Sequence, residues 1–157
     1  MYPLRKSKWQ WATSRALIHT LLVLCFLFGF AAIVSNVALS LGWQALSTHA
    51  SKIHVTFMLL LVNNCFVVTC FYLTGFSKSR VYYIALLLVN LFVWSLALSL
   101  LIPWLRSSAT LVTCKMFTYI FIEVYAYTLA ASLGWVRIKS IVPFYLILIA
   151  AILEHSL

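Results

Sequence analysis

Four hydrophilic side chains lie inside long apolar runs of this sequence: Asn63, Asn64, Asn90 and Glu123. A carboxyl group surrounded by hydrocarbon can hold a proton or a cation, and an amide can donate a hydrogen bond to it. Left unpaired, each of these groups would cost on the order of 1–3 kcal/mol. We therefore expect the four side chains to meet in one interior polar cluster, with the asparagines donating to Glu123.

Two roles for this cluster remain open. It can hold helices together, at about 0.6–2 kcal/mol per polar contact, or it can be a protonatable or ion-binding site on a transport path. A proton relay needs several titratable groups. The chain has no Asp and only one Glu besides Glu123, so the sequence favours the structural role.

The segment 109–135 carries two further patterns, each with a four-residue spacing. The first is a polar stripe made of Lys115, Tyr119, Glu123 and Tyr127. The second is a track of small residues made of Ala126, Ala130 and Gly134. Residues four apart share one face of a helix, and small residues let two helix backbones approach closely. We expect this helix to be buried, either in the bundle or in an oligomer.

Other reactive groups indicate no catalytic, metal or cofactor site. The cysteines all fall in apolar runs and form no Cys-x-x-Cys pair; they are Cys25, Cys65, Cys70 and Cys114. His49 and His54 lack carboxylate or thiol neighbours, so they read as loop residues. The sequence also lacks a nucleophile elbow, a His-Glu-x-x-His motif and a phosphate-binding glycine loop. We expect a protein that is not an enzyme.

The elements that position these residues are membrane helices. Of 157 residues, 65% are hydrophobic and 8% are charged, whereas soluble domains usually carry about 25% charged residues. The sequence predicts an all-α polytopic bundle, one transmembrane domain over 1–157, with the lipid bilayer as its solvent. Its five helices are expected near 16–41, 54–75, 81–102, 109–135 and 141–153. The first four reach the roughly 20 residues that a span requires, and the fifth is short.

The basic residues predict the orientation of the bundle. If all five segments span, eight lie on one side: Arg5, Lys6, Lys8, Arg15, Lys78, Arg80, Arg137 and Lys139. The other side receives only Lys52, Arg106 and Lys115. The positive-inside rule then places the N-terminus in the cytoplasm and the protein in the cytoplasmic (inner) membrane. Segment 1–15, with its tryptophans, is expected to lie along the membrane surface. The net charge of +9 comes from scarce acids, so we expect no nucleic-acid partner.

Three stretches resemble the stage II sporulation protein M family of small five-helix membrane proteins. Residues 58–75 are similar to its apolar stretch with paired asparagines and a terminal glycine. Residues 86–92 match its asparagine in the following helix, and residues 121–134 are similar to its glutamate helix that ends in alanines and glycine. The shared residues coincide with the four hydrophilic side chains found from hydropathy alone.

The resemblance implies non-enzymatic work in an assembly. Sporulation members look like scaffolds for cell-wall hydrolases, and relatives in bacteriocin gene clusters accompany an ATPase. We expect a subunit of a multi-component transport or export complex, assembling through small-residue and buried polar helix contacts. Its expected partners are other membrane proteins or a second copy, and a separate ATPase. Two alternatives stay open: a membrane scaffold that recruits cell-envelope enzymes, and an immunity protein or holin.

Overall fold

The computed structural model describes residues 7–40, 57–105 and 110–155, with side chains described for 7–33, 57–95 and 114–155. These residues form five α-helices, which confirms the all-α prediction. They are α1 (Lys8–Ser40), α3 (Phe57–Phe76), α4 (Arg80–Leu105), α5 (Thr110–Trp135) and α6 (Val142–His155). His49 and His54, which the sequence analysis interprets as loop residues, lie outside the described residues.

Helix α1 begins earlier than the sequence predicted. The segment expected to lie separately on the membrane surface is, from Lys8 onward, the first part of α1. The cause is a capping box: Gln10 N donates to Ser7 Oγ at 3.2 Å, and Ser7 N donates to Gln10 Oε1 at 3.0 Å. Together these bonds satisfy backbone groups that an uncapped helix end leaves open.

Two short turns join neighbouring helices at the same end of the bundle. After α3, Lys78 N donates to Gly75 O, and after α5, Arg137 N donates to Gly134 O, both at 3.0 Å. Lys78 and Arg137 have positive φ values of 55° and 57°. This left-handed conformation is ordinarily left to glycine, because a Cβ there costs about 1–2 kcal/mol. Two basic residues therefore occupy the strained positions of both turns.

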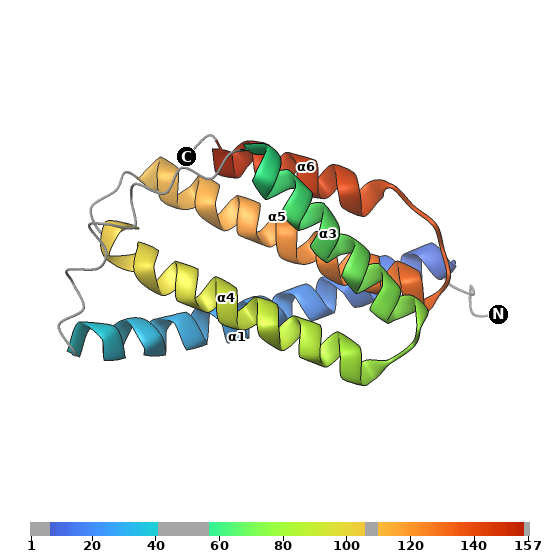
Figure 1. Cartoon of the computed structure of the whole chain (residues 1–157), viewed down its shortest axis with the longest axis horizontal. Helices are drawn as coiled ribbons and strands as arrows, with labels where there is room; N and C mark the ends of the chain where they lie inside the picture. Colours follow the sequence, from blue (N-terminus) through green and yellow to red (C-terminus); the bar gives the residue numbers. More distant parts are fainter. Residues whose placement is uncertain (1–6, 41–56, 106–109, 156–157) are drawn as a thin grey trace, which may run out of the picture.

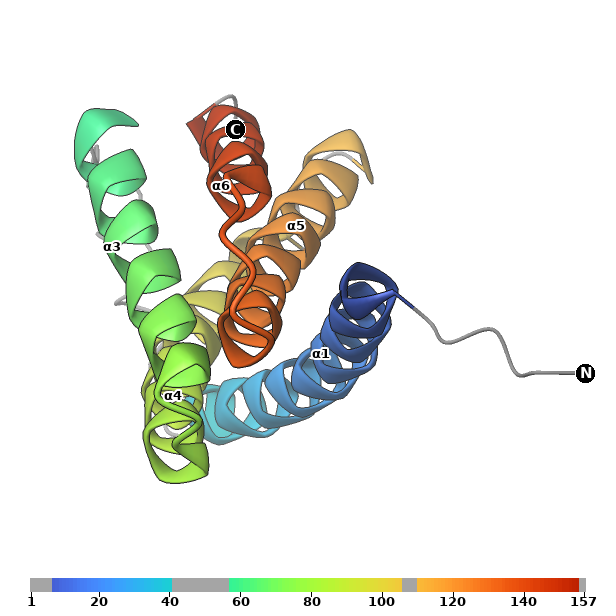
Figure 2. The same cartoon turned by 90° about the vertical axis from the view of Figure 1, so that its right-hand side faces the viewer.

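Helix α5 is the centre of the bundle. It packs against α3, α6 and α1, whereas α4 packs mainly on α1. Figure 2 shows α5 between α6 and α1, with α3 on the other side of α6 and α4 below α3. The helices alternate in direction, so that α1, α4 and α6 begin at the end where α3 and α5 finish (Figure 1). A central helix of this kind is the element most able to carry polar groups away from lipid.

The outer surface is apolar. Large side chains on α1, α3 and α4 expose more than half of their surface, among them Ile18, Phe26, Met58, Phe66, Val81 and Phe92. In the described part of the chain, three helices are long and apolar enough to cross a bilayer: Lys8–Ile33, Phe57–Phe76 and Cys114–Trp135. The chain is thus a multi-pass membrane protein. Helix α6, with 14 residues, is about 21 Å long and falls short of the roughly 30 Å hydrocarbon layer.

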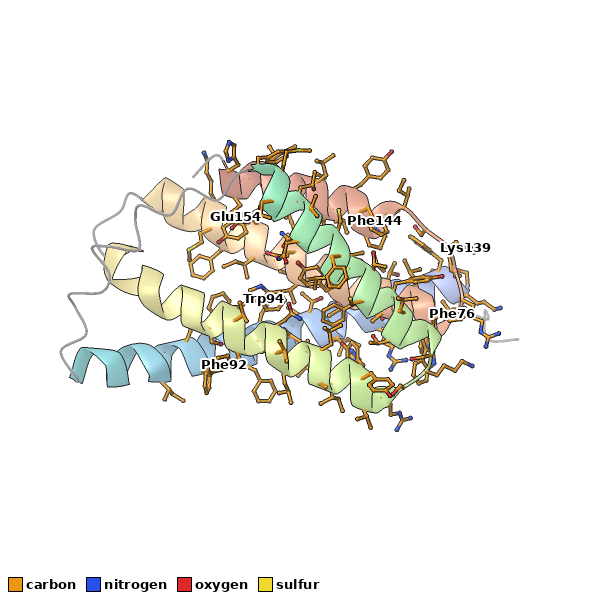
Figure 3. All side chains as sticks on the ribbon, viewed as in Figure 1. Phe76, Phe92, Trp94, Lys139, Phe144 and Glu154 are labelled. Carbon is orange, nitrogen blue, oxygen red and sulfur yellow. The ribbon has the colours of Figure 1, made fainter. Side chains whose placement is uncertain are left out.

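Basic residues gather where the two short turns lie. We call this the basic end; its described members are Lys8, Arg15, Lys78, Arg80, Arg137 and Lys139. Among the lysines and arginines whose side chains are described, Lys115 lies at the opposite end of the bundle, where α5 begins. Figure 3 shows Lys139 and Phe76 at the basic end and Glu154 toward the other. The grouping of charges that the sequence predicted is therefore present in these residues, while Arg5, Lys6, Lys52 and Arg106 lie outside the described side chains.

Candidate functional site

The small-residue track of α5 packs against α3 of the same chain. Ala126, Ala130 and Gly134 are all buried, and the first two belong to a core cluster with side chains of α3 and α6. A methyl group added to Gly134 would collide with the backbone of α3 at Tyr72 and Phe76. The sequence predicted that this track would be buried either within the bundle or in an oligomer. In the structure it is buried within the bundle. Because this face of α5 is already occupied by α3, it is not free to serve as an assembly surface.

The partner of Gly134 at this crossing is a second glycine, Gly75 of α3. A methyl group on Gly75 would collide with the carbonyl of Ala131. Sequence reasoning had treated Gly75 only as the residue that ends a helix. The contact could have been predicted from the sequence, because both glycines lie near the ends of their helices. Two such residues come to the same level when those helices end at the same side of a bundle. Their meeting lets the two backbones touch.

Glu123 lies in the interior, with 7% of its surface exposed. Tyr127, one turn further along the predicted polar stripe, donates its hydroxyl to Glu123 Oε1 at 2.6 Å. The Tyr127 ring is stacked between Phe71 of α3, at a centroid distance of 5.3 Å, and Trp94 of α4, at 5.6 Å. Two neighbouring helices therefore fix the donor that satisfies the carboxyl group.

The asparagines do not form the predicted cluster around Glu123. Asn90 Nδ2 donates to Leu86 O of its own helix at 2.8 Å. Asn64 is buried, but Asn63 is exposed, and its amide reaches only Asn64 Oδ1, at 3.4 Å. No hydrogen bond joins any of these three residues to Glu123, all of which the structure describes. The physical reason is local: Tyr127 already supplies a donor from the same helix, so the carboxyl needs none from α3 or α4.

Glu154 is the acid that sequence reasoning missed. It lies near the end of α6, half-buried, and interacts electrostatically with Glu123. The geometry of the α5–α6 hairpin explains this approach. Glu123 precedes the end of α5 at Trp135 by twelve residues, and Glu154 follows the start of α6 at Val142 by twelve residues. Equal distances from one turn bring two residues of antiparallel helices to the same level.

Two other predicted members of the polar stripe lie toward the beginning of α5. Tyr119 is buried and interacts electrostatically with both Glu123 and Glu154. Lys115 is half-buried. Tyr119, Glu123, Tyr127 and Glu154 form what we call the acidic centre. Chemically, carboxyl groups beside phenols can hold or share a proton.

A polar contact between α1 and α5 also escaped the sequence reasoning. The hydroxyls of Thr20 and Thr128 are 2.7 Å apart, and Thr128 Oγ1 also lies 3.2 Å from Ala16 O. Both threonines are fully or almost fully buried. Short hydroxyl side chains that bond across helices are a common device in membrane bundles. The sequence analysis did not single out these two threonines among the polar residues of the apolar runs.

The four cysteines are free thiols. Cys25 and Cys114 are exposed, and Cys65 and Cys70 are half-buried. Within the described residues, no group of three or more His, Cys, Asp or Glu side chains is arranged to hold a metal ion.

No protein-family model matches the chain, and no curated protein or solved structure matches it either. Over residues 7–40, 57–105 and 110–155 the chain has five helices, and three of them are apolar and long enough to cross a membrane.

Proposed function

We propose that this chain is a non-enzymatic membrane subunit of a multi-component transport or export complex. It joins a helix of another membrane protein, or of a second copy, through the outer face of α3. The resemblance to the stage II sporulation protein M family remains part of this proposal. In it the bundle lies in the cytoplasmic membrane with its basic end in the cytoplasm.

The observation that carries the proposal is the exposed amide of Asn63. Asn63 lies about 5 Å from the middle of α3, a helix long enough to cross the bilayer. Its hydrogen bond to Asn64, at 3.4 Å, is longer than the usual 2.7–3.2 Å. Facing acyl chains, such an amide would be left largely unsatisfied. A partner helix that brings an acceptor to this face would remove that cost.

The apolar neighbours of Asn63 suit the same contact. Val62 and Phe66 expose 62% and 66% of their surface and flank the amide on the outer face of α3. They supply packing area, while Asn63 supplies the directional bond that fixes the register of the two helices. The inner face of α3 is already used by α5, so the two contacts do not compete.

The basic end supports the cytoplasmic orientation and gives a surface for a separate ATPase. Positive charges in short connections favour the cytoplasmic side of a membrane. Lys78 and Arg137 occupy positions where glycine would be less strained. If these two positive charges are needed for function, basic residues are expected to remain at these positions in spite of the conformational strain.

The acidic centre favours transport over a passive scaffold. A carboxyl group buried inside a bundle, as Glu123 is, is costly, and a scaffold for envelope enzymes would not need it. Under the scaffold alternative, function would depend on the connection 42–53, which lies outside the described residues. Glu123→Gln separates the two: it removes titration but keeps the shape, so it should impair transport and leave a scaffold unaffected.

The experiment that tests the assembly is site-specific photo-crosslinking in the native membrane. A crosslinking residue at position 63 should give a discrete product with a partner or a second copy. The same residue at Ile152, which is 53% exposed on α6, is the matched control and should give none. Asn63→Leu should abolish copurification of that partner in mild detergent. Equal crosslinking at both positions, or copurification that survives Asn63→Leu, would refute the proposed interface.

A further inference from the structure

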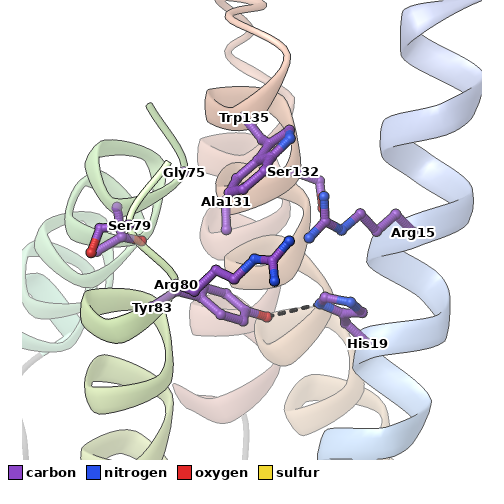
Figure 4. A pocket seen from close by; sticks show the side chains of 10 residues that line it. Arg15, His19, Gly75, Ser79, Arg80, Tyr83, Ala131, Ser132 and Trp135 are labelled. Carbon is purple, nitrogen blue, oxygen red and sulfur yellow. Dashed lines mark hydrogen bonds between the residues drawn. The ribbon is translucent and has the colours of Figure 1, made fainter. Parts of the chain in front are cut away.

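A small cavity lies at the basic end of the bundle, between α1, α3, α4 and α5 (Figure 4). Its volume is about 40 Å³, which corresponds to roughly three water molecules when each needs about 10–15 Å³. A tetrahedral oxyanion is of similar size. Most of its lining surface is apolar, but six hydrophilic residues reach it: Arg15, His19, Thr74, Ser79, Arg80 and Ser132.

Two arginines enter this cavity from opposite helices. Figure 4 shows the guanidinium groups of Arg15, on α1, and Arg80, on α4, reaching toward each other. Arg15 is held in place between two indole rings, at 4.9 Å from the centroid of Trp11 and 5.0 Å from that of Trp135. Like charges repel, and an anion between or beside the two groups would offset that repulsion.

The chain itself supplies no such anion. Its only acidic side chains are Glu123 and Glu154. Glu123 is twelve residues from Trp135, or roughly 18 Å along α5, and Glu154 lies at the same level. Neither arginine forms an ion pair with a carboxylate in the part of the chain that the structure describes. A compensating charge at this cavity would therefore come from a bound anion.

The cavity also presents an unused hydroxyl. Ser132 of α5 lines the cavity and has only 4% of its surface exposed, yet its hydroxyl bonds to no described residue. Thr74 and Ser79, by contrast, use their hydroxyls on nearby backbone groups. His19 Nδ1 lies 3.1 Å from Tyr83 Oη at the cavity wall. The Ser132 hydroxyl, beside two arginines, is available to an oxygen of a bound ligand.

We propose that this cavity binds a single phosphate group. Guanidinium groups match the geometry of phosphate oxygens, and their bonds to it are strengthened by charge. The cavity lies at the end of the spanning helices, where phospholipid headgroups are found, and basic pockets between membrane helices bind such headgroups. The phosphate can therefore belong to an anionic lipid or be free in solution. The experiment distinguishes the two sources.

Binding is measured on the full-length protein in a neutral detergent by native mass spectrometry, with phosphatidylglycerol, phosphatidylcholine and inorganic phosphate as probes. Arg80→Gln should weaken binding of the favoured probe about tenfold or more, because it removes charge-assisted hydrogen bonds. Arg137→Gln is the control, since it removes the same charge at the same end but stacks on Phe76 outside the cavity. It should change binding less than about twofold.

Arg80 is exposed and is the first residue of α4, where a positive charge opposes the helix dipole, so Arg80→Gln should fold normally. Circular dichroism checks this, and Ser132→Ala offers a second variant that keeps all charges. Selective phosphatidylglycerol binding that depends on Arg80 and Ser132 supports a lipid headgroup. The same dependence for inorganic phosphate supports a free anion. The proposal is overturned if no probe binds, or if the Arg80 and Arg137 variants lose binding equally.

Discussion

The crossing of α3 and α5 makes Gly134→Ala the sharpest test of the fold. The added methyl group would meet backbone atoms of α3, with Phe76 N at 2.9 Å from the new carbon. A side chain could avoid the methyl group by changing its rotamer, but backbone atoms of a helix cannot move in this way. The two helices must therefore separate. Overpacking of this kind costs about 1–3 kcal/mol, and we expect the upper part of that range.

Gly29→Ala is the matched control. Gly29 also lies within a helix, but no atom lies within 4 Å of its added carbon. Both substitutions gain the same helix propensity, about 1 kcal/mol, so the difference between the variants isolates the steric term. Gly29→Ala should be neutral or slightly stabilising.

The assay is unfolding in mixed micelles, with increasing dodecyl sulfate and circular dichroism as the readout. Gly134→Ala should unfold at a lower detergent fraction than Gly29→Ala, by about 1–3 kcal/mol. Gly75→Ala should behave similarly, and the double variant should cost less than the two single variants added, because both loosen one crossing. A Gly134→Ala protein as stable as Gly29→Ala would refute the close approach of these helices.

Three further predictions use the same unfolding assay. Tyr127→Phe keeps the stacked ring but removes the donor to Glu123, so it should cost about 1–3 kcal/mol; unchanged stability would mean that the carboxyl group does not depend on this bond. Lys78→Gly and Arg137→Gly relieve positive φ values and should each gain about 1 kcal/mol, and a loss would contradict the left-handed turns. Ser7→Ala removes the cap of α1 and should cost about 1 kcal/mol, whereas Ser7→Asp, which also caps, should restore it.

Several features followed from the sequence because they depend on composition or on short-range spacing. A chain with so few charged residues has to place its apolar segments in lipid, and each segment there has to satisfy its own backbone as a helix. The grouping of basic residues follows from the alternation of helix direction. The burial of Ala126, Ala130 and Gly134 follows from their spacing, since small residues on one face make close packing possible. The Glu154 contact was also within reach, because it needs only a tight turn and equal distances along two antiparallel helices.

Which way each polar side chain faces was decided by the tertiary structure. The helices are apolar on every side, so no hydrophobic stripe in the sequence marks the face that turns inward. Asn63 and Asn64 differ by one position, and only the packing of α3 against α5 leaves the first exposed and the second buried. The same holds for the cavity at the basic end, whose two arginines are far apart in the sequence. Sequence fixes how deep a residue lies along its helix, but the rotation of that helix about its axis depends on contacts with all its neighbours at once.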